Sequence, residues 1–299
     1  MLVAEDIKNI YKAMLGRQPE NDAIIDRYLN NHKTIDTIIS QVQKSEEYKK
    51  IYCLANIPKT VLVYIHIPKT AGTYLRTAWL KKNVKNYYWS DEKRSSPLVK
   101  DFKESYIVAS SYEMIGGHLP LSTFLEFQTL QPRYFLNVLR EPVSRIISFY
   151  NHIKNNDTNH PLHEEANSHT LYELLSEKGV FYKMILNEQV RYLIASGESL
   201  KNFSDRDLLI VGRQDNIGDF VETVNKVAGL ECGCEESESV EANTGAENYE
   251  IEIKKQKDFS KALTILRKIT KTEKRLFQQL STIKVMNKEQ YLMFIKSFS

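Results

Sequence analysis

The sequence has few cysteines, few glycines and no long apolar run. Its three cysteines are Cys53, Cys232 and Cys234, and the last two stand together in "CGC". An odd number of cysteines argues against a disulfide framework, and a zinc site would lack a second cysteine pair, so free thiols are favoured. No run approaches the ~20 apolar residues of a membrane-spanning helix, and "MLVAEDIKNI" lacks the basic start and apolar stretch of a secretory signal. We therefore expect a cytoplasmic protein with no transmembrane segment and no required metal.

The charges of the chain nearly cancel. A net charge of +3 is too small to argue for nucleic-acid binding, but it allows a local basic face for an anionic ligand. With 42% hydrophobic and 26% charged residues, the composition is that of a folded protein. A chain of 299 residues has room for two units, since a domain takes roughly 100 to 200 residues.

The first part of the chain has a helical pattern throughout. Apolar residues fall on one face over residues 7–15, "GRQPEND" breaks the pattern, and a second face begins at residues 24–29. Thr34 is placed to cap a third helix. We predict a three-helix, all-α module over residues 1–55.

The pattern then changes to alternating strands and helices. Four short runs are rich in Val, Ile, Leu and aromatic residues: "VLVYIHI" (61–67), "YIVAS" (106–110), "RYFLNVL" (133–139) and "LLIVG" (208–212). Such runs are typical of strands buried on both faces. We predict an α/β domain over residues 56–299, with a P-loop-like, three-layer parallel sheet flanked by helices. Ligands bind at the carboxyl ends of such strands, so the loops that follow them are the candidate sites.

The loop after the first predicted strand, "HIPKTAGTYL", is built for an anion. Lys69 brings a positive charge, Thr70 and Thr73 bring hydroxyl groups, and Gly72 allows close approach of the backbone. The N–H groups of the following helix favour an anion at the same place. The order of residues differs from the nucleotide-triphosphate loop G-x-x-x-x-G-K-[ST]. The alternative is a plain helix entry, with Thr70 as a cap and Lys69 in solvent.

A second segment, "FLNVLREPVSRIISFYNHIK", has the features of a phosphate site. A strand ends at Arg140, Pro142 starts a helix, and Ser148 follows Arg140 by two helical turns. Arg140 and Ser148 can thus reach one phosphate from two sides. Alternatively, Arg140 and Arg145 pair with surface carboxylates.

Together these segments resemble the paired signature of sulfotransferases that use 3′-phosphoadenosine 5′-phosphosulfate (PAPS). "HIPKTAGTYL" looks like the 5′-phosphosulfate loop and "LREPVSRIISFY" like the 3′-phosphate segment, with uronyl and heparan sulfate 2-O-sulfotransferases as the closest relatives. "GGHLPLSTFLEF" matches the place of that group's catalytic histidine, at His118. The resemblance extends over roughly residues 60 to 285. It departs from the family at Tyr74, where a serine is usual, and at Glu141, where an aspartate is usual.

The resemblance implies an O-sulfotransferase that moves a sulfuryl group from PAPS to a carbohydrate hydroxyl, in a glycan or glycolipid, by in-line displacement. It implies catalytic roles for His118, as general base, and for Lys69. The implied donor-binding residues are Lys69, Thr70, Ala71, Gly72, Thr73, Tyr74, Arg140 and Ser148. Because no signal or anchor is seen, we expect a bacterial-type enzyme. "IYKAMLGRQPE" is similar to a small helical domain of unknown function found on bacterial proteins that often act on glycans, although a plain packing module is an equally good interpretation.

Two other functions stay open at this point. A P-loop-like small-molecule kinase would need an acidic residue at another strand end, and a non-catalytic glycan-binding protein would keep the fold alone. The polar stretch "NHIKNNDTNHPLHEEANSH" carries four histidines, but their irregular spacing predicts a mobile surface loop rather than a metal site. The resemblance implies that this loop lies near the acceptor. Asn187, Gln189 and Arg191 match a further family block, but they could equally serve internal hydrogen bonding.

Overall fold

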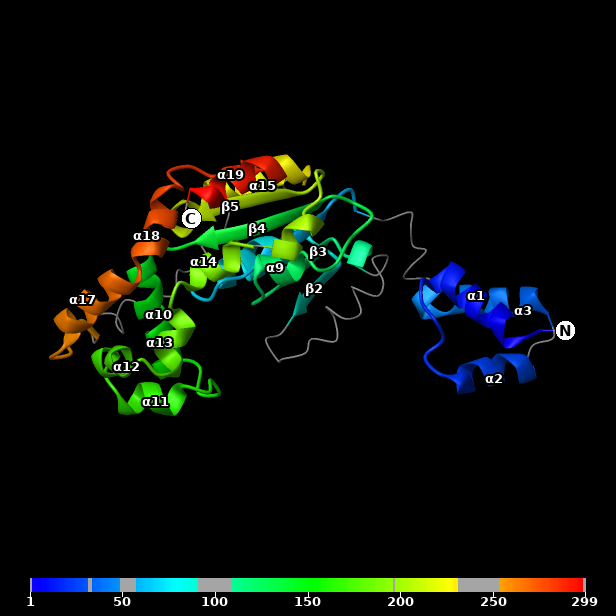
Figure 1. The fold of residues 1–299 in the computed structure, drawn as a ribbon, viewed down its shortest axis with the longest axis horizontal. Helices are drawn as coiled ribbons and strands as arrows, with labels where there is room; N and C mark the ends of the chain where they lie inside the picture. The colour runs from blue at the N-terminus through cyan, green and yellow to red at the C-terminus, as the bar shows by residue number, and fades with distance from the viewer. Residues whose placement is uncertain are drawn as a thin grey trace.

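The computed structural model describes residues 2–31, 34–48, 58–90, 109–195, 197–230 and 253–297. Three helices come first: α1 (Ala4–Leu15), α2 (Asp22–Asn31) and α3 (Ile35–Lys44). Their apolar faces share one core, which includes Ile7, Tyr28 and Ile38 (Figure 1). The expected cap is present, because the Thr34 hydroxyl accepts a hydrogen bond from the backbone N–H of Thr37. The predicted division at residue 55 lies outside the described residues and stays a prediction.

A six-stranded sheet forms the centre of the remaining chain. Its strands are β1 (Val61–Ile65), β2 (Tyr87–Ser90), β3 (Met114–Gly117), β4 (Arg133–Leu139), β5 (Leu208–Arg213) and β6 (Lys284–Met286). They lie in the order β2-β3-β1-β4-β5-β6. The first five are parallel, and β6 pairs with β5 in the antiparallel sense. The predicted α/β class is confirmed, but a wholly parallel sheet is wrong at this edge, where a three-residue strand gave no pattern to detect.

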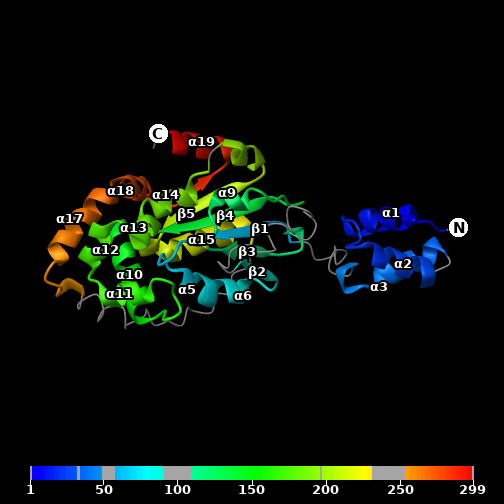
Figure 2. The ribbon, with the colours of Figure 1, turned by 60° about the horizontal axis from the view of Figure 1, so that its bottom comes forward.

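Helices cover both faces of the sheet. Alternate residues of β1 enter different cores: Val61 and Val63 belong to one, and Leu62 and Tyr64 to the other. The first core is closed by α9 (Leu121–Phe124), α14 (Glu188–Leu193), α18 (Lys271–Gln278) and α19 (Lys288–Lys296). The second is closed by the continuous helix formed by α5 (Gly72–Tyr74), η2 (Leu75–Leu80) and α6 (Lys81–Asn83), and by α15 (Ile217–Ala228). In Figure 2, α9, α14 and α19 lie above the strands, and α5 and α6 lie below them.

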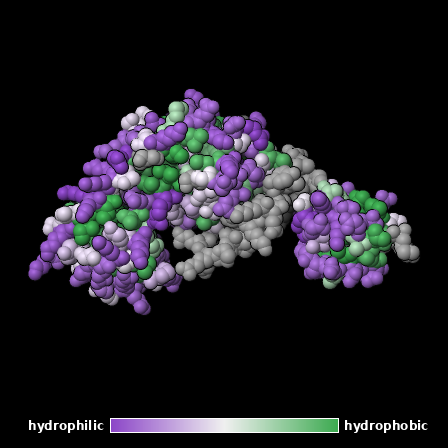
Figure 3. Space-filling model, viewed as in Figure 1, coloured by the Kyte–Doolittle hydropathy of each residue, from purple (hydrophilic) through white to green (hydrophobic). Residues whose placement is uncertain are grey.

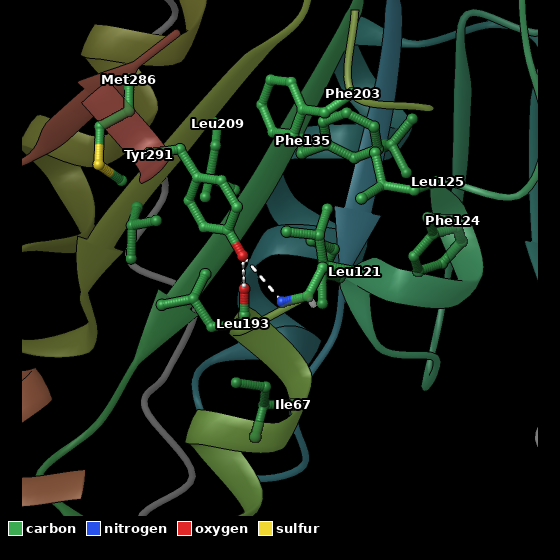
Figure 4. Packing of buried hydrophobic residues seen from close by; sticks show 14 of the residues in the cluster. Ile67, Leu121, Phe124, Leu125, Phe135, Leu193, Phe203, Leu209, Met286 and Tyr291 are labelled. Carbon is green, nitrogen blue, oxygen red and sulfur yellow. Dashed lines mark hydrogen bonds between the residues drawn. The ribbon is translucent and has the colours of Figure 1, made fainter. Parts of the chain in front are cut away.

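The first core is tied to the chain by one buried tyrosine. The hydroxyl of Tyr291 donates a hydrogen bond to the carbonyl of Leu193 (3.0 Å) and accepts one from the N–H of Ala195 (2.8 Å). Figure 4 shows these bonds within the apolar cluster around Phe135 and Leu209. A buried hydroxyl is costly unless it is paired, so the two bonds fix α19 against the segment after α14.

A separate group of helices extends from one end of the sheet. It contains α10 (Pro142–Asn155), α11 (His163–Ser168), α12 (Leu171–Glu177), α13 (Val180–Ile185) and α17 (Phe259–Ile269), which share a core of their own. Two 3₁₀ turns, η3 (Gly197–Asn202) and η4 (Gln214–Asn216), flank β5. Most of the histidine-rich stretch at 151–169 is helical, since residues 151–155 end α10 and residues 163–168 form α11. The prediction of a loop is therefore wrong for most of this stretch.

The strand predicted at residues 106–110 is wrong for the two of its residues that the structure describes. Residues 106–108 lie outside the described residues, Ala109 and Ser110 are helical, and the strand is β3, which carries Gly116 and Gly117. Glycine weakens strands, so propensity argues against this segment. Packing requires it, however, because a Cβ on Gly116 would lie 2.8 Å from the Trp89 ring and one on Gly117 would lie 2.6 Å from the carbonyl of Ser90.

No helix within the described ranges is both long enough and apolar enough to cross a membrane. The face of the molecule in Figure 3 is mostly hydrophilic over both the N-terminal helices and the helices that cover the sheet.

Candidate functional site

Three loops meet where the central parallel strands end. β1 lies between β3 and β4, and the residues that follow these strands are His66, His118 and Arg140 respectively. The N–H of His66 donates to the carbonyl of Gly117 (3.0 Å), so the first two loops begin side by side. From β1 the chain continues to one side of the sheet with β2 and β3, and to the other with β4 and β5. In open α/β sheets, ligands usually bind in the crevice at the carboxyl ends of the strands, where the strand order reverses in this way.

The loop after β1 has an unusual backbone. Lys69 (φ 68°) and Ala71 (φ 73°) both adopt the left-handed conformation, which costs a non-glycine residue of order 1 kcal/mol or more. The buried hydroxyl of Thr70 donates to the carbonyl of Ile67 (2.9 Å) and closes the turn from inside. Strain of this kind is held only where the surrounding structure over-determines it, and it concentrates at ligand sites. The arrangement therefore favours an anion loop over a simple helix entry.

Gly72 has a second task besides close approach to a ligand. A Cβ at this position would lie 1.7 Å from Nε2 of His66, which is an impossible distance. The ring of His66 thus packs directly against the first turn of the helix. Two contacts therefore restrain the loop: the ring of His66 against Gly72, and the hydrogen bond from Thr70 to Ile67.

His66 and His118 form an aromatic pair. Their ring centroids are 4.1 Å apart with an interplanar angle of 39°, and Trp89 contacts both rings. Burial lowers the pKa of His66 well below its usual range, and the charges of His118, Arg76 and Lys69 act in the same direction. His66 is therefore neutral at pH 7. The hydroxyl of Tyr192 donates to the carbonyl of His118 (3.1 Å) and fixes its backbone.

Two cations face the same loop. Nη1 of Arg140 donates to the backbone carbonyl of Lys69 (3.2 Å), so the guanidinium lies against the loop. Burial, together with the charge of Arg140, lowers the pKa of the Lys69 ammonium. Among the described residues no carboxylate forms an ion pair with Lys69. Two adjacent cations raise each other's energy, and an anionic ligand between them removes this cost.

The other predicted donor-binding residues lie around this point. Thr73 is exposed in α5, and Tyr74 packs partly against the core on the side of α15, so its hydroxyphenyl group is used in packing. Ser148 lies half-buried on α10. His152, one turn further along α10, has a pKa lowered by burial and then by the charge of Lys69, so this helix faces the loop. The individual contacts that Thr73, Tyr74 and Ser148 were predicted to make with a ligand stay predictions.

The sequence did not single out the residues that hold Arg140. The side chain of Gln189 makes two hydrogen bonds with the main chain of Arg140. Arg145 is fully buried and pairs with Glu188 (2.5 Å) and Glu273 (4.0 Å), so it does not pair with surface carboxylates. Only the family block "LNEQVRYLIASG" offered a signal for this network, and residue types alone could not separate packing from function.

Histidines of the stretch at 151–169 contact other groups of the protein. Within the described ranges no group of three or more His, Cys, Asp or Glu side chains is arranged to hold a metal ion. His163 instead contacts the carbonyl of Ile153 through Nδ1 (2.8 Å), and His169 lies 3.7 Å from Glu177.

A family model described as "Sulfotransferase family" matches residues 55–206, about half of the 299 residues. No curated protein matches the chain. The matched range contains the loops after β1, β3 and β4, and with them every predicted site residue.

Proposed function

This chain belongs to the sulfotransferase family, and we propose that it transfers a sulfuryl group from PAPS to a hydroxyl of a carbohydrate acceptor. The observation that carries the proposal is the meeting of Lys69, His118 and Arg140 at the ends of three adjacent strands. A cationic loop and an imidazole at one crevice fit an anionic donor and an acceptor that must lose a proton.

The residues present fit PAPS as the donor. PAPS has an anionic 5′-phosphosulfate and an anionic 3′-phosphate, and it supplies the sulfuryl group when bound. We assign the 5′ end to Lys69 and to the N–H groups at the start of the helix that runs from Gly72 to Asn83. Arg140 and Ser148 are assigned to the 3′-phosphate. The lowered pKa of Lys69 supports the first assignment, because a partly buried ammonium that pairs with no carboxylate among the described residues gains most from an anion.

His118 serves as the general base. It takes the proton of the acceptor hydroxyl while the acceptor oxygen forms its bond to sulfur and the bond between sulfur and the bridging oxygen breaks. A positioned base contributes typically 10²- to 10⁴-fold to such a step. The neutral state of His66 supports this role, because a second charge 4.1 Å away would oppose protonation of His118.

Lys69 stabilises the negative charge that develops on the departing phosphate oxygen. Such stabilisation is the largest contribution in many group-transfer enzymes, with losses of about 10²- to 10³-fold when one donor is removed. The left-handed turns at Lys69 and Ala71 preorganise the loop, so little reorganisation is needed during the reaction.

The carbohydrate nature of the acceptor rests on the resemblance to uronyl and heparan sulfate 2-O-sulfotransferases. The similarity of α1–α3 to a domain often attached to glycan-acting proteins supports the same class. We further propose that the enzyme acts in the cytoplasm on a soluble, nucleotide-linked or lipid-linked sugar.

The test is a direct assay of transfer. Purified protein is incubated with PAPS and a panel of sugars, glycolipid precursors and phenols, and release of adenosine 3′,5′-bisphosphate is measured together with the mass of the acceptor. We expect release that depends on a carbohydrate and an acceptor mass increased by one sulfate. Parallel reactions with ATP and Mg²⁺ test the kinase alternative. Transfer of phosphate, or sulfation of phenols alone, would overturn the proposal.

A further inference from the structure

We propose that Gln189 is a positioning residue, which holds Arg140 in the orientation needed for the donor's 3′-phosphate. This inference rests on the proposed function. Gln189 lies in α14 and is fully buried. Its Oε1 accepts a hydrogen bond from the N–H of Arg140 (2.9 Å), and its Nε2 donates to the carbonyl of Arg140 (3.0 Å).

These two bonds pair the backbone N–H and carbonyl of Arg140 at the point where the sheet ends. The register of β4 with β5 ends at Leu139, so Arg140 is the first residue beyond the ladder. Gln189 presents a donor and an acceptor side by side, as a neighbouring strand would. It thereby continues the pairing of β4 by one residue, at the residue whose side chain carries the charge.

Gln189 is itself held firmly. Its backbone N–H donates to Oε1 of Glu273 in α18 (2.7 Å), and the preceding Glu188 pairs with Arg145 in α10 (2.5 Å). The backbone of α14 at Glu188 and Gln189 is therefore anchored to two other helices. Buried ion pairs hold their geometry strongly, since displacement of one partner leaves the other charge unpaired.

The restraint continues from Arg140 into the loop after β1. Nη1 of Arg140 donates to the carbonyl of Lys69 (3.2 Å), so the path runs from α14 through Arg140 to the loop. Removal of the Gln189 bonds removes two restraints on the Arg140 main chain. It leaves the bond from Tyr192 to the carbonyl of His118 in place. The expected effect is a loss of donor affinity at the 3′-phosphate without a comparable loss of the chemical step.

The test compares Gln189→Met with Gln131→Met. Methionine has the length of glutamine but makes neither bond. Gln131 is a matched control, because it is also buried (8% exposed) and its Nε2 donates to a carbonyl, that of Ser110 (2.9 Å), before the start of β4. Calorimetry measures the Kd of adenosine 3′,5′-bisphosphate and of adenosine 5′-monophosphate.

We expect Gln189→Met to weaken bisphosphate binding about 10-fold or more, as for one to two lost hydrogen bonds, and monophosphate binding by less than about 3-fold. Gln131→Met should change neither, and kcat at saturating PAPS should fall less than about 3-fold in Gln189→Met. An equal loss for both ligands, or no loss, overturns the positioning role. If the wild-type protein does not prefer the bisphosphate, the proposed function itself fails.

A second variant covers the case in which Gln189→Met does not fold. In Gln189→Glu a protonated carboxyl group can donate and accept as the amide does, whereas the carboxylate can only accept. Bisphosphate affinity relative to wild type should therefore be low at pH 8 and recover as the pH is lowered to 5.5. A ratio that does not change with pH overturns the inference.

Discussion

The ring of His66 occupies the space that a side chain at Gly72 would need. A Cβ there would lie 1.7 Å from Nε2 of His66, and the ring cannot turn aside because Tyr64, Trp89 and His118 surround it at centroid distances of 5.4, 5.6 and 4.1 Å. The loop after β1 and His118 are thus packed together through the ring of His66.

Gly72→Ala should destabilise the protein, because one extra methyl group must displace an enclosed ring. Overpacking of this kind costs about 1–3 kcal/mol. Urea unfolding measures the loss, and Gly218→Ala in α15 is the control, since no atom lies within 4 Å of its added Cβ. The control should be neutral or more stable by up to ~1 kcal/mol. Adding His66→Ala to Gly72→Ala should recover part of the loss, and an unchanged midpoint for Gly72→Ala alone would contradict the contact.

His66 should make stability depend on pH. Burial lowers its pKa in the folded state, whereas the unfolded chain titrates near ~6.5. As the pH falls below about 6.5, the unfolded state binds a proton at His66 that the folded state does not bind, so the free energy of unfolding decreases. His66→Leu should start from lower stability but lose less between pH 7 and pH 5, as followed by urea unfolding. His152, whose pKa is also lowered, keeps part of the dependence in both proteins. Equal slopes would show that His66 does not titrate as described.

The parts of the fold that could be predicted are those where local pattern and packing agree. β4 and β5 are apolar runs buried on both faces, and their pattern indicates strands correctly. β3 is short and ends in two glycines, which the rings and backbone of β2 require. The need for glycine comes from contact with β2, which lies about 27 residues earlier in the chain, as the pairing of Tyr87 with Met114 shows. A local sequence pattern therefore cannot indicate it.

The candidate site divides in the same way. Lys69 and Arg140 are found from the sequence because they follow predicted strands, whereas His118 is indicated only by the resemblance, since the sequence pattern does not predict β3. The family block includes Gln189, but its role could not be assigned, because its contacts are with the main chain of Arg140, 49 residues away. A main-chain contact does not depend on which side chain the partner carries, so the residue types give no signal for it.

His118→Ala should abolish transfer and leave donor binding intact. The rate at saturating PAPS should fall by about 100-fold or more, as for the loss of a general base, while the Kd of adenosine 3′,5′-bisphosphate stays within about 2-fold. His169→Ala is the control, since His169 is 37% exposed and lies beside Glu177. It should keep wild-type turnover. Undiminished turnover in His118→Ala would refute the base assignment.

Arg140→Ala should weaken donor binding through the 3′-phosphate. A hydrogen bond to a charged group contributes about 1.5–3 kcal/mol, so the Kd of the bisphosphate should rise roughly 10- to 100-fold. Adenosine 5′-monophosphate should lose far less. Arg213→Ala is a matched control, because Arg213 also ends a strand but pairs with Asp215 and lies over the ring of Phe277 (4.1 Å). If both ligands lose equal affinity in Arg140→Ala, its assignment to the 3′-phosphate is wrong.

Arg145→Met should destabilise the fold more than any change of a surface charge. Arg145 is fully buried between Glu188 and Glu273, and burial already raises the pKa of Glu273. Removing the arginine leaves two buried carboxyl groups without their cation, and breaking a buried pair in this way costs about 3–5 kcal/mol. Urea unfolding at pH 7 measures the loss. Lys261→Met removes an exposed cation paired with Asp258 (2.8 Å) and should leave the midpoint unchanged.

Because the raised pKa of Glu273 allows the folded state to take up a proton, the loss of stability in Arg145→Met should be smaller at pH 5 than at pH 7. A loss that is equal at both pH values would show that missing packing, and not unpaired charge, is the cause.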